Sequence, residues 1–434
     1  MRRVYFLLIS IMLFSCEKEK DESPPRIIIN QPGTGFQTFS YGDNLIVDFR
    51  ATDNVGISGW TIRMVGPDGK MWYTNGIQPV SDAPTNFNTN FGFPLDEIHA
   101  PSGTYSLGVF VQDTEGNEGA SFRDVTYFEA PLERERIVVI STPSSNEIRI
   151  DSLSNGAMAF AGTLPGDLSA IANGSYHREL ILGGSETSSL RFLDSPELIL
   201  SNSFDGQNPL GDVFVRDISF DQVTKHYWAS FFDGTIREFR SGGTLRSSFN
   251  VPDNQQPEEL LAVEDRILIE STTIGTQVRT LGFYGIAGGE LLDAIGLDFD
   301  LVALLPYDSE YVIGFGNEGN SPQVMLINPL NAETIELDVF FNDSPINHVI
   351  ALTNGRYGIA QEEGVYVRGF LPNTLSPSTP NGINARHLSE DRTTGTVYAV
   401  DGNTLYALDP NSVNTINQWD LQNNPLFVEI LHNK

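Results

Sequence analysis

The sequence VFVRDISFDQVTKHYWASFFDGTIREFRSGG, residues 213–243, contains three apolar runs separated by turn residues. The runs cover residues 213–220, 225–231 and 235–240. The first turn starts at Asp221, the second is Asp233-Gly234, and Gly242-Gly243 ends the unit. An Asp-Gly pair between apolar runs is a strong hairpin signal, because both residues tolerate a positive φ. The stretch therefore predicts a unit of short antiparallel strands.

Similar units recur further along the chain. One has strands at 385–388, 396–400 and 404–408, with turns at Gly395 and Asp401-Gly402. Another has strands at 348–352, 357–361 and 365–369, with turns at Asn354-Gly355 and Glu363-Gly364. Weaker copies begin near Leu168, Leu260 and Leu301. A repeat of this length indicates one supersecondary unit that is used many times around a shared core.

The phase of the repeat predicts how the array closes. Residues 136–140 and 147–150 match the second and third strands of a unit, and the final apolar strand, 426–431, matches a leading strand. Joined, they give seven units in residues 136–434, or about 43 residues each, the length of a four-stranded blade. Pairing the two ends would remove open sheet edges. We predict a seven-bladed β-propeller at 136–434, closed by strand 426–431. Six or eight blades remain open, because the units near Leu260 and Leu301 are irregular.

Residues 26–130 predict a separate β-sandwich. Strand candidates are 26–30, 44–51, 59–65, 70–74, 103–112 and 121–129, a rhythm that suits a seven-strand sandwich. The phrases ATDNVGI (51–57), GTY (103–105) and DTEGN (113–117) resemble bacterial immunoglobulin-like surface modules. The resemblance implies an immunoglobulin-like sandwich, so the chain as a whole is expected to be all-β.

Residues 1–15 are typical of a secretory signal peptide. Arg2 and Arg3 precede an apolar run, residues 4–14, that is too short to span a bilayer as a mature helix. The run ends in Leu-Phe-Ser before Cys16, which is the only cysteine. This arrangement resembles the bacterial lipobox and implies cleavage before Cys16 and acylation of that residue. The alternative is an ordinary signal peptide followed by an incidental cysteine.

Residues 16–25 read CEKEKDESPP, a charged segment that ends in prolines and is expected to be a solvated tether. It also resembles the acidic stretch that directs lipoproteins of Bacteroidetes-type bacteria to the outside of the outer membrane. The implied location is the cell surface, with attachment to the membrane through the lipid. A plain linker is the alternative.

The charge balance argues against one class of partner. The 434 residues include 56 acidic and 26 basic side chains, which gives a formal net charge of −30. Such a surface repels phosphate backbones, so we expect no nucleic-acid partner.

Catalytic candidates are few. His348, His387 and His432 fall in or beside leading strands, which line the central channel of a propeller. They would suit metal binding or acid–base chemistry, but three unrelated strand residues are the favoured interpretation. The sequence contains no His-x-His, His-Glu-x-x-His or Gly-x-Ser-x-Gly motif. We therefore assign no catalytic residue, metal or cofactor, and keep His348 and His387 as weak ligand-binding candidates.

Other candidates lie elsewhere in the chain. Trp72 and Tyr73 are adjacent on a predicted strand and point to opposite faces, so one aromatic side chain is a weak ligand-contact candidate. Ser152 lies in Asp-Ser-Leu, which resembles a short O-glycosylation motif of Bacteroidetes. Asp53, Asp113 and Glu115 suit either calcium or ordinary Asp turns, and the turns are favoured.

These observations predict a surface lipoprotein that acts as a binding or scaffold module for a glycan, a peptide or an outer-membrane protein. The sandwich would serve as stalk and spacer. One alternative is a propeller enzyme, a hydrolase or lyase that acts on polysaccharide. Another is an accessory subunit of an outer-membrane transport or assembly complex.

Overall fold

The computed structural model describes residues 21–154, 156–185, 189–206, 213–337, 343–370 and 381–434. The fold is all-β: within these ranges the strands are joined by turns and by two short 3-10 helices, Ser175–His177 and Ser241–Gly243. The chain divides at residue 131 into two units, called unit 1 and unit 2 below. Among the described residues, no helix has the length and apolar character needed to cross a membrane.

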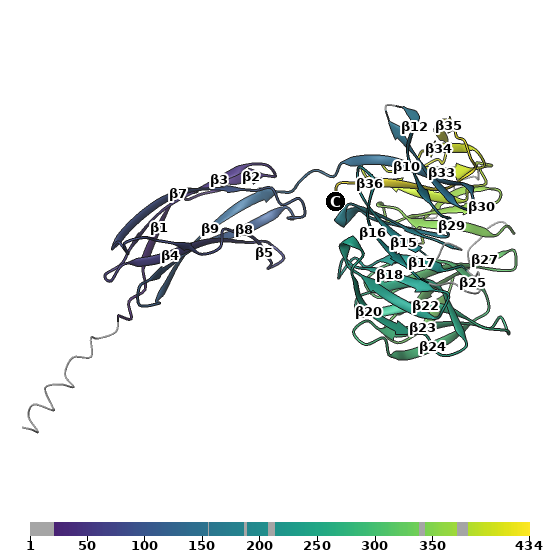
Figure 1. The fold of residues 1–434 in the computed structure, drawn as a ribbon, viewed down its shortest axis with the longest axis horizontal. Coiled ribbons are helices and arrows are strands. Elements are labelled where there is room, and N and C mark those ends of the chain that lie inside the picture. Colours follow the sequence, from purple (N-terminus) through teal and green to yellow (C-terminus); the bar gives the residue numbers. More distant parts are fainter. Residues whose placement is uncertain (1–20, 155, 186–188, 207–212, 338–342, 371–380) are drawn as a thin grey trace, which may run out of the picture. The chain divides into compact units, whose positions relative to one another are not determined.

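Unit 1 consists of two sheets with a core between them (Figure 1). One sheet has the order β1 (Arg26–Gln31), β3 (Asn44–Thr52) and β7 (Asn86–Pro94). The other has the order β2 (Thr38–Ser40), β9 (Glu118–Phe128), β8 (Gly103–Asp113), β4 (Ile57–Val65) and β5 (Met71–Thr74), and β6 (Gln78–Pro79) also pairs with β4. The core includes Phe49 and Trp60, whose rings meet edge to face at 5.4 Å. The burial of Trp60 is what its strand pattern predicts.

The described residues of unit 2 form seven small sheets, several of which are labelled by their strands in Figure 1. From one edge to the other, six of them are β36-β10-β11-β12 (Pro425–His432, Arg134–Ser144, Glu147–Ser154, Ala157–Pro165); β13-β14-β15-β16 (Ala170–Gly174, Glu179–Gly183, Ser189–Asp194, Ile199–Asp205); β17-β18-β19-β20 (Val215–Phe220, Tyr227–Phe231, Thr235–Phe239, Leu245–Asn250); β21-β22-β23-β24 (Gln255–Val263, Arg266–Thr273, Arg279–Gly285, Leu291–Leu297); β25-β26-β27-β28 (Asp300–Pro306, Val312–Glu318, Ser321–Ile327, Thr334–Glu336); and β32-β33-β34-β35 (His387–Asp391, Thr396–Asp401, Thr404–Leu408, Thr415–Asp420). The seventh has three described strands, β29-β30-β31 (Ile346–Ala351, Tyr357–Gln361, Gly364–Arg368).

The seven sheets meet through their first strands. In cyclic order β36, β13, β17, β21, β25, β29 and β32 each contact the next, and β32 contacts β36 again. The fourth strands, such as β20 and β35, carry mostly exposed side chains and lie at the opposite edges. This arrangement of four-stranded sheets is consistent with a β-propeller.

The two ends of unit 2 share one sheet. β36 pairs antiparallel with β10, which places Ile430 opposite Ile137 and Val428 opposite Val139. This is the pairing on which the predicted ring closure depends. β10 occupies the second position in its sheet and β11 the third. The first position of that sheet is filled by β36, the last strand of the sequence.

The turns of the repeat use the Asp-Gly and Asn-Gly pairs in a specific way. Gly234, Gly355 and Gly402 have φ values of 83°, 74° and 53°, and in each pair only the glycine has a positive φ. Asp233 instead accepts a hydrogen bond from the Thr235 amide at 3.0 Å. The aspartate therefore stabilises the turn through its carboxylate, while glycine supplies the left-handed backbone.

Large apolar side chains pack between neighbouring sheets. Trp228 on β18 is fully buried in a cluster that includes Ile236 of its own sheet and Leu260 and Ile269 of the next. Such clusters recur around unit 2, so each sheet buries its faces against its neighbours. The core of unit 2 is therefore a series of apolar layers between neighbouring sheets. Around the central axis, where the first strands meet, the side chains can be polar.

Candidate functional site

Polar side chains from four first strands converge near the axis of unit 2. They are His348 on β29, His387 and Ser389 on β32, Glu429 on β36 and Asn173 on β13, and we call them the axial cluster. The residues come from distant parts of the sequence, and the ring of first strands brings them together.

The two histidines stack on each other. The ring centroids of His348 and His387 are 4.0 Å apart, and the ring planes are tilted by 35°. The Leu388 amide donates a hydrogen bond to Nδ1 of His348 at 3.2 Å, so this nitrogen carries no proton. Burial lowers the pKa of His348 to about 4. Burial, together with repulsion from His348, lowers the pKa of His387 well below its usual value. Both rings are therefore uncharged at neutral pH.

Glu429 lies beside this pair. Its Oε1 is 3.7 Å from Nε2 of His387, and its Oε2 accepts hydrogen bonds from Asn173 Nδ2 at 3.4 Å and Ser389 Oγ at 3.3 Å. Burial raises the pKa of Glu429 to about 7, although those two hydrogen bonds oppose the rise. With a pKa of about 7, Glu429 is protonated in about half of the molecules at pH 7, and because His387 is uncharged the contact between them is not a salt bridge.

One atom of the axial cluster lacks a partner. Nδ1 of His387 is buried and has no hydrogen-bond partner, and the residue as a whole is 6% exposed. A hydrogen bond between His387 and the Val428 backbone opposes the fall in its pKa. A buried polar nitrogen without a partner costs free energy. A group that offers a hydrogen bond to this nitrogen would recover that cost, which makes His387 the most specific feature of the cluster.

A second group of carboxylates lies on β17 and β21, which are neighbouring first strands. Asp217 accepts hydrogen bonds from the amides of Leu260 at 2.9 Å and Ile218 at 2.7 Å, yet burial raises its pKa to about 6. Burial and repulsion from Asp217 raise the pKa of Glu259 well above its usual value. This pair therefore retains protons to a higher pH than exposed carboxyl groups.

The third histidine expected beside the channel has a different role. At the end of β36, Nε2 of His432 lies 3.3 Å from Oδ1 of Asp391 and 3.2 Å from the amide nitrogen of Arg392. The structure therefore brings His348 and His387 together and separates His432 from them. His177 and His226 lie off the first strands, and they contact the Lys225 carbonyl and Glu238 respectively.

Trp72 and Tyr73 occupy opposite sides of β5, as adjacent strand residues must. Tyr73 is buried, its ring packs against Phe93 at 5.7 Å, and its hydroxyl oxygen accepts a hydrogen bond from the Glu97 amide. Trp72 is half-buried against the core of unit 1, and its indole N–H donates to Asp68 at 3.0 Å. Both side chains have partners within unit 1, and ligand contact by Trp72 or Tyr73 stays a prediction.

Two covalent modifications were predicted, acylation of Cys16 and glycosylation of Ser152. Cys16 lies outside the described residues. Ser152 is buried on β11 between Val138 on β10 and Ala159 on β12. A glycan on its hydroxyl would have to displace that packing, so the motif remains a sequence prediction.

Three carboxylates gather at one end of unit 1. One oxygen each from Asp21, Asp53 and Asp113 lies within 4.8 Å of the others, and Glu115 is not part of this group. Asp53 accepts hydrogen bonds from the Val55 and Gly56 amides. Asp113 accepts from the amides of Glu115 and Asn117. These are the turn bonds that the sequence favoured, and they occupy the Oδ1 atoms of both residues.

The repeat predicted that His348 and His387 lie on leading strands, but Glu429, Asn173 and Ser389 were not among the candidates; ligand binding at the two histidines stays a prediction. Glu429 carried a usable signal, because it is the only charged residue in the apolar closing strand Phe-Val-Glu-Ile-Leu, residues 427–431. Charged residues inside a buried strand are rare unless they are paired.

Glu429→Gln is expected to stabilise unit 2 at pH 8 by up to about 3 kcal/mol and to have little effect at pH 4.5. The pKa of Glu429 is raised in the folded chain, so its contribution to stability is complete below pH 4.5 and is lost as the pH rises through 7. Glutamine resembles the protonated form at every pH. Denaturant unfolding at pH 4.5, 6 and 8 measures the difference, with Glu336→Gln on the exposed strand β28 as control. A stability difference that does not vary with pH would contradict the assignment.

Comparisons with known proteins give similarity of fold. No protein-family model matches the chain, and no curated protein matches it. A solved structure of a Lactobacillus plantarum protein aligns with 14% identity and a TM-score of 0.53, covering 69% of this chain and 100% of that one. A quinoprotein alcohol dehydrogenase-like protein from Bacteroides thetaiotaomicron aligns with 12% identity and a TM-score of 0.49, covering 94% of this chain and 99% of that one. A Bacteroides caccae protein of unknown function aligns with 11% identity and a TM-score of 0.42, covering 58% and 98%. At these identities, the first similarity is one of fold alone.

Proposed function

We propose that this protein is a surface-anchored lipoprotein whose unit 2 binds a glycan, a peptide or an outer-membrane protein at the axial cluster. The observation that carries the proposal is the unpartnered Nδ1 of His387, which lies among polar side chains from four first strands. Ligand sites commonly combine apolar walls with a few convergent polar groups that orient the ligand. Because the pKa shifts leave His348, His387 and much of Glu429 uncharged near pH 7, the cluster suits a neutral hydrogen-bonding group better than an ion.

The architecture in this proposal is a seven-bladed β-propeller on an immunoglobulin-like sandwich. The cyclic contacts among seven first strands support the blade number. The two packed sheets of unit 1 support the sandwich.

The anchor in this proposal is acylated Cys16, followed by the acidic tether. Its support is the sequence around Cys16 and residues 16–25. We expect labelled palmitate to be incorporated into the wild-type protein and not into Cys16→Ala, with the variant shifting from the membrane fraction to the soluble fraction. Equal labelling of the two proteins would exclude the anchor while leaving the binding proposal intact.

The binding proposal is tested with His387→Gln. We expect this variant to bind its ligand at least tenfold more weakly, because the substitution changes the hydrogen-bonding groups that the axial cluster presents. The ligand is first captured with the purified wild-type chain on a glycan array and from solubilised outer membranes. His177→Gln is the matched control, since His177 lies outside the axial cluster. Equal affinity of His387→Gln and wild type would remove the axial cluster from the binding site.

A second candidate is a propeller enzyme that acts on polysaccharide, either a hydrolase or a lyase. The observation that favours it is the approach of His387 to Glu429 at 3.7 Å, with the pKa of Glu429 near 7. A carboxyl group with a pKa near the working pH suits proton transfer. This candidate predicts that Glu429→Gln abolishes turnover of a polysaccharide while leaving its binding intact. The binding proposal predicts no turnover in either protein.

A further inference from the structure

One face of the sheet that contains β8 and β9 in unit 1 is open to solvent, and we call it the outer face. Val125 and Tyr127 point into the core from β9, while the alternate residues Phe122, Asp124 and Phe128 point outward. The alternation follows from the two-residue period of a strand. Two large aromatic side chains, Phe122 and Phe128, are therefore exposed on the outer face and do not contribute to the core of unit 1.

The aromatic residues at one end of the outer face are held by their neighbours. The rings of Phe122 and Phe110 meet edge to face at 5.6 Å, and the Arg63 guanidinium lies 4.5 Å from the Phe110 ring centroid. A Cβ on Gly108 would lie 2.7 Å from Phe110 and 3.0 Å from Phe122, so both rings rest against the glycine backbone. Phe122 nevertheless remains 53% exposed. The result is an ordered aromatic platform.

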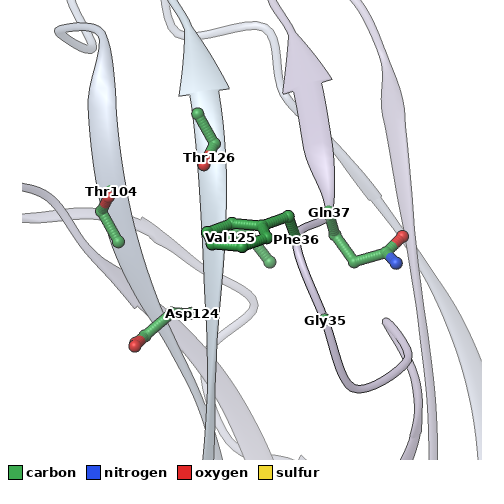
Figure 2. Close-up of a pocket in the computed structure, with 7 residues that line it drawn as sticks. All are labelled: Gly35, Phe36, Gln37, Thr104, Asp124, Val125 and Thr126. Atoms are coloured by element: carbon green, nitrogen blue, oxygen red, sulfur yellow. The ribbon is translucent and has the colours of Figure 1, made fainter.

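The other end of the outer face is a shallow pocket of about 270 Å³. Its lining combines the ring of Phe36 with the side chains of Gln37, Thr104, Asp124 and Thr126 (Figure 2). Phe36 is fully exposed and lies in the segment that precedes β2. In register, Thr104 lies opposite Thr126, Ser106 opposite Asp124, and Gly108 opposite Phe122, so the pocket and the platform are consecutive rows of one surface. From Phe122 to Thr126 the rows span about 13 Å.

We propose that the outer face of unit 1 binds a neutral glycan chain. A sugar ring has an apolar face of C–H groups and a rim of hydroxyls. Exposed phenyl rings can pack against the apolar face of the sugar, and threonine, glutamine and carboxylate side chains can form hydrogen bonds with its hydroxyls. A surface that alternates these two kinds of side chain along about 13 Å offers both kinds of contact to a short stretch of a sugar chain.

Charge narrows the class of glycan. Asp124 is exposed where the pocket meets the platform, and the whole chain has a net charge of −30. The Arg63 guanidinium lies beside Phe110 on the same face, but the net charge of the chain outweighs this one cation, so acidic polysaccharides are disfavoured. The structure therefore assigns the outer face to uncharged sugars. The assignment does not depend on the axial cluster, and it gives unit 1 a binding role in addition to that of a spacer.

Affinity electrophoresis of the purified full chain tests this assignment. Gels contain dextran, laminarin or galactomannan as neutral probes and polygalacturonate as the acidic one. We expect at least one neutral polymer to retard the protein and polygalacturonate not to do so. Phe122→Ala and Phe36→Ala are each expected to weaken the retardation at least tenfold in dissociation constant, because each removes one exposed ring.

Phe160→Ala is the matched control. Phe160 is 58% exposed on β12 of unit 2 and has the Arg149 guanidinium 4.9 Å from its ring centroid, so it repeats the local chemistry of the platform in a different unit. Equal retardation of wild type, Phe122→Ala and Phe36→Ala would overturn the proposal, as would no retardation by any neutral polymer. Loss of retardation in His387→Gln alone would also overturn it, and would support ligand binding at the axial cluster instead. A dimer that dissociates on Phe122→Ala, measured by light scattering, would reassign the outer face to self-association.

Discussion

Val428→Asp is expected to prevent unit 2 from folding under conditions in which the wild-type chain is stable. Val428 is fully buried on β36, and it pairs with Val139 on β10. Its cluster joins the last sheet, through Tyr398 and Leu405, to the first. A carboxylate here would be buried without a partner, which costs more than about 4 kcal/mol. Displacing β36 would also expose the edges of β10 and of the neighbouring first strands.

Thermal unfolding followed by circular dichroism, together with limited proteolysis, measures this effect. Ile416→Asp is the control. Ile416 is 60% exposed on the outermost strand β35, and the substitution introduces the same charge near the same end of the chain. The control is expected to unfold within a few degrees of the wild type. If Val428→Asp also does so, the closure of the ring does not contribute to stability as argued here.

Much of unit 2 was predictable because its signals are local. The stretch 213–243 predicted strands that correspond to β17, β18 and β19, since turn residues separate its apolar runs clearly. The pairing of β36 with β10 followed from the phase of the repeat, with Ile137 opposite Ile430. The outermost strands have weaker signals. β20 exposes nearly all of its side chains, so no burial pattern marks it as a strand.

In unit 1 the sequence predicted most of the longer strands but not β7. The six expected strands correspond to β1, β3, β4, β5, β8 and β9. The nine-residue strand β7 was missed, because Asn86, Asn88 and Asn90 are typical of turns. In the structure these residues alternate with more buried side chains that include Phe87 and Phe91, and β7 pairs along the whole length of β3. Tertiary packing against Trp60 and Phe49 outweighs the weak strand propensity of asparagine.

Only part of the axial cluster could be predicted from the sequence, and the reason differs from that in unit 1. The position of His348 and His387 on leading strands could be deduced from the repeat, but their stacking depends on the side-chain directions of two adjacent sheets. Asn173 reaches Glu429 across 256 residues of sequence, between the second sheet and the closing strand. Such convergence depends on the closure of the ring, and no local spacing in the sequence encodes it.

The same closure produces a second expected result, at Asp391. This residue is fully buried at the end of β32. Its carboxylate accepts hydrogen bonds from the Thr393 amide at 3.0 Å and the Thr394 hydroxyl at 2.9 Å, which stabilise a turn. It also contacts Arg134 on β10 at 2.8 Å and His432 on β36 at 3.3 Å. One carboxylate therefore joins the last sheet to both strands that close the ring.

Asp391→Ala is expected to lower the free energy of unfolding by about 3 kcal/mol or more at pH 7, because it removes the acceptor of the Thr393 amide and the Thr394 hydroxyl and the ion-pair partner of Arg134. Asp221 is the matched control. It is equally buried and bonds the Val223 amide and Thr224 in a corresponding turn, but its hydrogen bonds lie within that turn. Asp221→Ala therefore measures the turn alone, and we expect it to cost about 1–2 kcal/mol. Equal losses in the two variants would show that the contacts to Arg134 and His432 contribute nothing.

The pH dependence separates the charge of Asp391 from its packing. Burial alone would raise the pKa of Asp391, but the contact with His432 and the hydrogen bonds of Thr393 and Thr394 hold it below the ordinary value of 3.8. A lowered pKa contributes stability above that value and loses it as the pH falls through the folded-state pKa. The deficit of Asp391→Ala, measured by denaturant unfolding, should therefore be full at pH 7 and shrink below about pH 4. A deficit that stays constant down to pH 3 would assign the effect to lost packing, and ring closure would then depend on the apolar contacts around Val428 alone.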